Sequence, residues 1–115
     1  MAKIKHSVAT RRRKKKLLKS AKGFWGDRSK QYRQAKRALL HALTYAYRDR
    51  RNLKREMRGL WIARMNAACR QEGISYSSFM SGLKKAKVGL DRKVMAELAV
   101  SDPKAFQKLV QIARG

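Results

Sequence analysis

Residues 27–73 read DRSKQYRQAKRALLHALTYAYRDRRNLKREMRGLWIARMNAACRQEG, and this stretch decides the fold. It contains no proline, and its single internal glycine is Gly59. Most positions hold strong helix formers, and apolar side chains recur at the three- and four-residue spacing of a helix. We therefore predict one helix of about 45 residues, with Asp27 as its N-terminal cap, roughly 70 Å long at about 1.5 Å per residue. A helix of this length must extend beyond the core of so small a protein and lie on another molecule.

The apolar stripe of this helix fails at Tyr47–Arg51, where charged side chains point in nearly every direction. We predict that the helix has two roles, which meet near Gly59. Residues 59–115 are expected to form a globular all-helical domain, with Leu60, Met65 and Ala68 facing its core. Residues 1–58 are expected to form a basic helical extension that contacts the partner.

The charge of the chain is concentrated in that extension. The 115 residues carry a formal net charge of +24. Residues 1–58 hold 21 Lys and Arg against three acids, whereas residues 59–115 hold ten against four. This excess is far more than solubility requires, and it favours a polyanionic partner, above all a nucleic acid. An anionic membrane surface is the competing partner, but no segment is apolar and long enough to span a membrane.

The second half reads as a series of short helices with clear end signals. Gly73 is expected to end the long helix, and Ser75 to cap a helix running to about Ala86. Asp91 is expected to cap a further helix, with Val94, Met95, Leu98 and Ala99 as its buried face. Asp102-Pro103 predicts the start of the last helix. The predicted fold is all-α, a long basic helical N-terminal extension with a small C-terminal bundle of about four helices.

No catalytic or metal-binding constellation can be assembled from these residues. The chain has one cysteine, Cys69, and two isolated histidines, so a disulfide, a zinc site and a thiol nucleophile are all disfavoured. The N-terminus lacks the apolar stretch of a secretory signal. We therefore expect no enzyme activity, no cofactor, no membrane contact, no stable homo-oligomer and a cytoplasmic location.

Aromatic side chains interleave with the basic ones, as they do in many RNA-binding proteins. Unpaired bases stack on such rings and on guanidinium planes. Phe24 and Trp25 lie between two glycines, and we predict that they contact another molecule. Tyr45 and Tyr47 cannot share a helix face, so one is expected to pack and the other to contact RNA. Trp61 is expected at the core edge, and Cys69 in the core.

Two DNA-binding alternatives fit less well. A basic-zipper protein needs leucine heptads after its basic helix, and these are absent. A helix-turn-helix within residues 75–101 would offer Arg92, Lys93 and Glu97, which is a poor set for reading bases. A DNA-binding architectural protein is retained as a minor alternative.

Several motifs together resemble the L-twenty family of bacterial large-subunit ribosomal proteins. These are KGFWG at 22–26, YAYRDRR at 45–51, LWIAR at 60–64, GISYS at 73–77, GLKKA at 82–86 and DRK at 91–93. The resemblance runs in register from residue 1 to about residue 112. The Phe24-Trp25 pair is bulkier than the usual pattern of the family.

The resemblance implies a structural protein of the cytoplasmic ribosome that binds large-subunit (23S) rRNA directly and is needed early in subunit assembly. It also implies contacts with neighbouring large-subunit proteins. An additional role, binding its own messenger RNA leader to repress translation of its own operon, is left open. Charge, aromatic character and matching position together select the candidate rRNA-binding residues. They are Lys3, Lys5, Arg11, Arg12, Arg13, Lys14, Lys15, Lys16, Lys19, Lys22, Trp25, Arg28, Arg33, Tyr45, Tyr47, Arg48, Arg50, Arg51, Lys54, Arg55, Arg58, Gly73, Ser75, Tyr76, Ser77, Lys84, Lys85 and Arg92.

Overall fold

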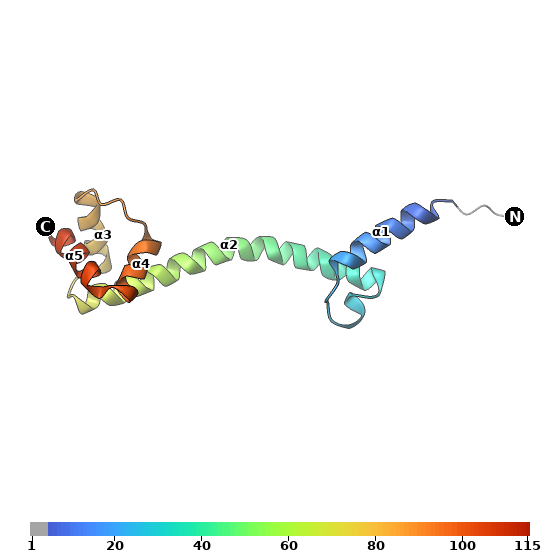
Figure 1. Cartoon of the computed structure of the whole chain (residues 1–115), viewed down its shortest axis with the longest axis horizontal. Helices are drawn as coiled ribbons and strands as arrows, with labels where there is room; N and C mark the ends of the chain where they lie inside the picture. Colours follow the sequence, from blue (N-terminus) through green and yellow to red (C-terminus); the bar gives the residue numbers. More distant parts are fainter. Residues whose placement is uncertain (1–4) are drawn as a thin grey trace. The chain divides into compact units, whose positions relative to one another are not determined.

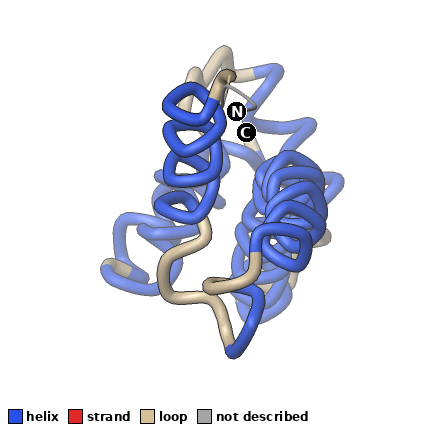
Figure 2. The backbone as a smooth tube through the Cα atoms, turned by 90° about the vertical axis from the view of Figure 1, so that its right-hand side faces the viewer, coloured by secondary structure: helices blue, strands red, loops and turns tan. Residues whose placement is uncertain are grey.

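The computed structural model describes residues 5–115, and every regular element in that range is a helix (Figures 1 and 2). The predicted all-α class is thereby confirmed. The elements in chain order are α1 (Ser7–Ser20), a single 3₁₀ turn η1 (Gly26–Arg28), α2 (Tyr32–Gln71), α3 (Tyr76–Lys85), α4 (Arg92–Ser101) and α5 (Pro103–Arg114).

Contacts between residues divide the chain into an N-terminal unit (Met1–Arg51) and a C-terminal unit (Asn52–Gly115). Helix α2 contributes residues to both units. The predicted boundary after residue 58 separates the extension from the part expected to fold by itself. This boundary remains a prediction. Each unit is described separately below.

The C-terminal unit is a bundle of α3, α4 and α5 around the last turns of α2 (Figure 1). All four helices supply side chains to one apolar core, with Trp61 packed at its edge and Cys69 fully buried inside it, as predicted. A buried Phe79–Phe106 pair, with ring centroids 5.2 Å apart, joins α3 to α5. The buried members are Met65, Cys69, Phe79, Leu83, Met95, Ala96, Phe106, Leu109 and Val110.

The predicted helix ends in this unit are confirmed by their hydrogen bonds. Gly73 adopts a left-handed φ of 71°, and the amide of Ile74 donates to the Cys69 carbonyl, which closes the end of α2. The side chain of Ser75 accepts from the Ser78 amide at the start of α3. The caps of α4 and α5 are Asp91, which accepts from the Val94 amide at 2.8 Å, and Asp102, which accepts from the Ala105 amide at 3.1 Å.

Two expectations about this core were wrong. Leu60 is 42 % exposed, because the core register of α2 runs through Ile62, Met65 and Cys69 at three- and four-residue steps. Five residues of helix separate Leu60 from Met65, which turns Leu60 well away from that face. In α4, Val94 is 45 % exposed, and Ala96 is buried in its place. The pattern of large apolar residues was misleading there, because the small side chain of Ala96 is enclosed while the larger Val94 is not.

The N-terminal unit begins with α1, which buries none of its own residues. Just beyond α1, Ala21 is fully buried, and so is Ala35 in the first turn of α2. The intervening turn uses Gly23 and Gly26, both at positive φ. Asp27 was expected to cap the long helix, but it lies in η1, and α2 begins only at Tyr32. The left-handed Gly26 tightens the chain into a separate turn there, and the Asp27 carbonyl accepts from the Gln31 amide.

Candidate nucleic-acid interface

The basic side chains of the N-terminal unit are exposed almost without exception. Helix α1 carries six consecutive cations, Arg11–Lys16, and their side chains encircle it because adjacent positions on a helix differ by about 100°. Lys5, Lys19, Lys22, Arg28 and Arg33 are exposed as well. Lys3 lies outside the described residues. The unit thus presents a broad cationic surface from the start of α1 to the first turns of α2.

These cations have almost no acidic partners within the described residues. The single ion pair between side chains of residues 5–115 joins Arg48 Nε to Asp49 Oδ1 at 3.0 Å, and both side chains are exposed. The hydrogen bond to Asp49, and then its charge, raise the pKa of Arg48 above its usual value. Because one ion pair neutralises so little of the positive charge of these residues, most of that charge is available to bind a polyanion.

Tyr45 and Tyr47 are both exposed, so the expectation that one of them packs into the protein was wrong. Each ring instead carries a guanidinium. The Arg48 guanidinium carbon lies 4.6 Å from the Tyr45 ring centroid, and that of Arg51 lies 5.1 Å from the Tyr47 centroid. The spacings of three and four residues bring these partners together on one turn of α2. In each pair the guanidinium lies over the face of the ring, so the positive charge and the aromatic ring form one stacked unit.

A groove of about 670 Å³ lies in the N-terminal unit between the Phe24–Arg28 turn and the early part of α2. It contains the predicted contacts Trp25, Arg28 and Tyr45. It also contains side chains that the sequence interpretation missed. Phe24, which was predicted with Trp25 to contact another molecule, also lines the groove, and the missed side chains are Gln34, Arg37 and His41. Their spacing along α2 is the three- and four-residue spacing of one helix face, and this was the available signal.

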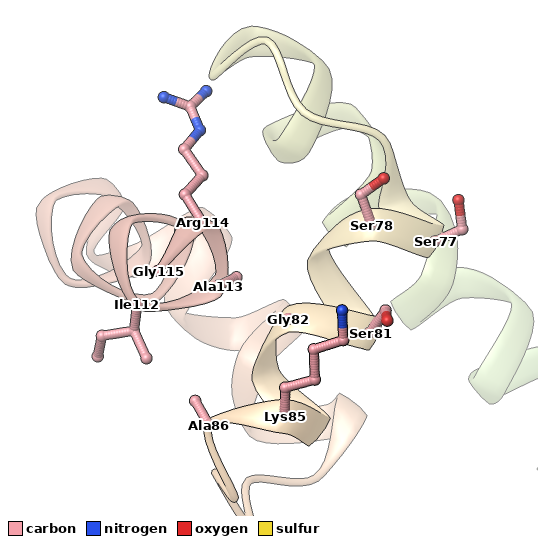
Figure 3. A pocket seen from close by; sticks show the side chains of 10 residues that line it. All are labelled: Ser77, Ser78, Ser81, Gly82, Lys85, Ala86, Ile112, Ala113, Arg114 and Gly115. Atoms are coloured by element: carbon pink, nitrogen blue, oxygen red, sulfur yellow. The ribbon is translucent and has the colours of Figure 1, made fainter.

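The C-terminal unit has a groove of about 610 Å³ between α3 and α5, seen in Figure 3. Ser77, Ser81 and Lys85 line it from α3, and Arg114 rises from α5. The two helices touch at their backbones, because a Cβ on Gly82 would overlap the Ala113 carbonyl. This close approach brings hydroxyl and cationic groups of the two helices to one hollow.

Several predicted contacts in this unit have structural partners. Arg92 Nε donates to the Tyr76 hydroxyl at 3.2 Å, and both residues are half-buried. The Ser75 hydroxyl caps α3 and also meets the hydroxyls of Ser77 and Ser78 at 3.2 and 2.8 Å. The remaining predicted side chains of this unit are exposed. They are Lys54, Arg55, Arg58, Lys84 and Lys85. Arg50 and Arg51, which belong to the N-terminal unit, are exposed as well.

The described residues contain no group of three or more His, Cys, Asp and Glu side chains that could hold a metal ion. None of the helices between residues 5 and 115 is both long enough and apolar enough to span a membrane. Burial raises the pKa of the one thiol, Cys69, to about 11.

These features define a class: a small, strongly basic, all-helical binding protein with exposed cations and aromatics. Within that class, the chain belongs to the ribosomal protein L20 family, whose profile matches residues 3–109. It is 54 % identical over 114 residues to the large ribosomal subunit protein bL20 of Roseiflexus sp. (strain RS-1), covering 99 % of this chain and 97 % of the relative. The family seen in the sequence motifs is confirmed, and with it a ribosomal protein of the large subunit in the cytoplasmic ribosome. The family is one of ribosomal structural proteins and not of enzymes.

Proposed function

We propose that the chain binds large-subunit (23S) rRNA directly and acts as a non-catalytic component in early assembly of the subunit. The observation that carries this proposal is the charge of residues 1–58, with 21 cations against three acids. In the described part of that segment, one cation alone has an acidic side-chain partner. Such a surface repels itself and is stabilised by a polyanion. Membership of a ribosomal protein family supports ribosomal RNA as that polyanion.

The proposal divides the contacts between the units. In the N-terminal unit and the adjoining turns of α2, cations and stacked Tyr–Arg pairs suit irregular RNA with splayed bases. In the C-terminal unit, hydroxyls and cations on α3 suit the phosphate and sugar backbone. Binding through both units would join RNA segments that are distant in sequence, which supports an early role in assembly. Neighbouring large-subunit proteins are proposed as further contacts.

The test is a salt titration of binding between the full chain and transcribed fragments of large-subunit rRNA. Affinity is expected to fall with a log–log slope of several units, because each neutralised phosphate contributes about −0.7 to −0.9. Random duplex DNA of equal length serves as the control and should bind at least tenfold more weakly. Equal affinity for both would contradict the proposal and favour the DNA-architectural alternative.

Binding of its own messenger RNA leader remains an additional proposal. The residues that would bind rRNA and leader RNA need not differ, so the fold does not separate the two roles. Competition between the leader RNA and the rRNA fragment for the full chain tests it. A leader that fails to displace the rRNA fragment would argue against translational repression.

A further inference from the structure

The Phe24–Arg28 turn of the N-terminal unit presents a tryptophan to solvent. Trp25 is 91 % exposed, although its indole is among the largest apolar surfaces of any side chain. Gly23 and Gly26, on either side of it, have φ values of 93° and 57° that favour glycine. This backbone keeps residue 25 at the rim of the groove of about 670 Å³. An exposed aromatic held in this way at a concave surface indicates a ligand.

The opposite wall of the groove is the face of α2 that carries Gln34, Arg37, His41 and Tyr45. The rings of His41 and Tyr45 lie 5.9 Å apart between centroids and are tilted by 31°. The Arg48 guanidinium covers the Tyr45 ring at 4.6 Å, so this wall combines aromatic rings with a positive charge. The groove therefore has aromatic groups on both walls.

The polar groups of the groove are those that recognise a nucleotide. Arg28 and Arg37 supply charge for phosphates, and the amide of Gln34 can both donate to and accept from a base edge. No acidic residue lines the groove, so an anionic ligand meets no repulsion there. A duplex would present phosphates, sugars and base edges to Trp25, whereas an unpaired base presents a ring face.

We propose that this groove is a nucleobase pocket, which takes an unpaired base of the bound RNA against Trp25. In this pocket Arg28 and Arg37 neutralise the flanking phosphates, and Gln34 contacts the edge of the base. The inference rests on the proposed function, because the base belongs to the rRNA segment held by the N-terminal unit. It adds Gln34, Arg37 and His41 to the residues expected to contact RNA.

A segment of a neighbouring protein is the other occupant to consider. A protein segment would need acidic groups for Arg28 and Arg37 together with a planar apolar group for Trp25. An RNA nucleotide contains a phosphate and a ring in a single residue, so the combined aromatic and cationic lining favours RNA.

The first experiment uses tryptophan fluorescence of the full chain. Trp61→Phe leaves Trp25 as the only tryptophan, since the protein has two. This variant is titrated with a single-stranded RNA hexamer and, at equal phosphate concentration, with a short RNA duplex. We expect the hexamer to quench Trp25 by at least half and the duplex to quench it much less. Equal quenching by both would overturn a pocket for an unpaired base.

The second experiment measures binding of the full chain to an rRNA fragment. Trp25→Ala is expected to weaken it by about tenfold, the usual size of one lost base–aromatic stack, while Trp25→Phe keeps most of the affinity. Because Trp25 is exposed, the circular dichroism spectrum should not change. Leu43→Ala, which removes an exposed apolar side chain of α2 that neither lines the groove nor is a predicted contact, serves as the matched control. If Trp25→Ala binds within twofold of wild type, the pocket is refuted and the proposed function stands.

Crosslinking in purified large subunits completes the test. Ultraviolet irradiation followed by mass spectrometry should identify a Trp25 peptide that carries a nucleotide. A Trp25 crosslink to a neighbouring protein would instead make this groove a protein contact and overturn the pocket. Absence of rRNA binding by the wild-type chain would refute the proposed function together with the pocket.

Discussion

Arg92 Nε donates a hydrogen bond to the hydroxyl of Tyr76 at 3.2 Å, and this bond joins the start of α3 to the start of α4. The two residues are 16 positions apart in sequence and both are half-buried. Each is also a candidate RNA contact on the basis of family motifs. Their hydrogen bond shows that both side chains also stabilise the C-terminal unit.

Tyr76→Phe is therefore expected to lower the free energy of unfolding by about 1 kcal/mol, the usual net value of one such bond. The rRNA affinity should stay within twofold of wild type. Urea denaturation and a binding assay measure the two quantities. Lys84→Ala, at an exposed position on the same helix, is the opposite case, with unchanged stability and weaker binding. If Tyr76→Phe reduces RNA affinity strongly without loss of stability, the hydroxyl contacts RNA.

The arginines of the middle of α2 provide a prediction about the salt dependence of binding. Replacing Arg48, Arg50 and Arg51 with Ala should weaken rRNA binding and reduce the salt slope by up to about 2 to 3 units. The stability of the C-terminal unit should not change, because these side chains are exposed and belong to the other unit.

The matched control for this triple variant removes the same charge elsewhere. Lys93, Lys104 and Lys108 are exposed residues of α4 and α5 and are not predicted contacts. Their replacement with Ala should change the slope by less than one unit. Identical slopes for the two triple variants would show that the effect is one of net charge alone.

Gly82 permits the contact between α3 and α5, so Gly82→Ala should destabilise the C-terminal unit. The added methyl group meets the backbone of Ala113, which cannot move aside as a side chain can. Such overpacking costs about 1–3 kcal/mol. Gly59→Ala is the control, because no atom lies within 4 Å of a Cβ there and alanine favours the helix by about 0.5–1 kcal/mol. Thermal unfolding should shift downwards for the first variant and upwards for the second.

The buried thiol gives the stability of the C-terminal unit a specific dependence on pH. Burial raises the pKa of Cys69 from its usual 9.0 to about 11. Between these values the unfolded chain loses a proton that the folded chain keeps, so the free energy of unfolding falls as pH rises. Below about pH 8 the thiol contributes no slope.

Urea denaturation at pH 8 and pH 10 measures this effect. The informative quantity is the difference between wild type and Cys69→Ala, because any other effect of alkaline pH is common to both. The variant should lose less stability between the two pH values. A decline as steep as that of wild type would show that the Cys69 thiol is not the cause.

The C-terminal domain is predicted to fold by itself. Every residue of the core cluster, with its packed neighbours, lies at or beyond Trp61. Residues 59–115 therefore keep the whole core, and about 57 residues can suffice for a stable domain. The purified fragment should show a cooperative thermal transition by circular dichroism. A fragment without helical signal at low temperature would contradict the domain division.

The sequence predicted the helix ends of the C-terminal unit well, because caps are local signals. Ser75, Asp91 and Asp102 each bind an amide three residues ahead, and neighbouring residues alone determine that geometry. The exposure of Leu60 could not be predicted in the same way. An apolar stripe in the sequence does not show which residues at its edge are buried. Packing against α3, α4 and α5 decides which face of α2 enters the core.

The groove of the N-terminal unit was partly predictable for the same reason. Trp25 is notable from its glycine neighbours alone, and Arg37 and His41 share a helix face by their spacing. What faces that helix depends on the late start of α2 at Tyr32, which follows from the positive φ of Gly26. The sequence favoured Asp27 as the N-terminal cap, so the predicted helix began before the observed start of α2 at Tyr32.

The bonds of Glu72 set an order of events during translation. Its side chain accepts from the Gln107 amide at 2.8 Å, and its carbonyl accepts from Arg114, so α5 is fastened to the end of α2. Helix α5 also supplies Phe106, Leu109 and Val110 to the core. A nascent chain that lacks α5 cannot close this core, although the cations of residues 1–58 have already been synthesised. Of the helices that form this core, the one synthesised last is thus the one that completes it.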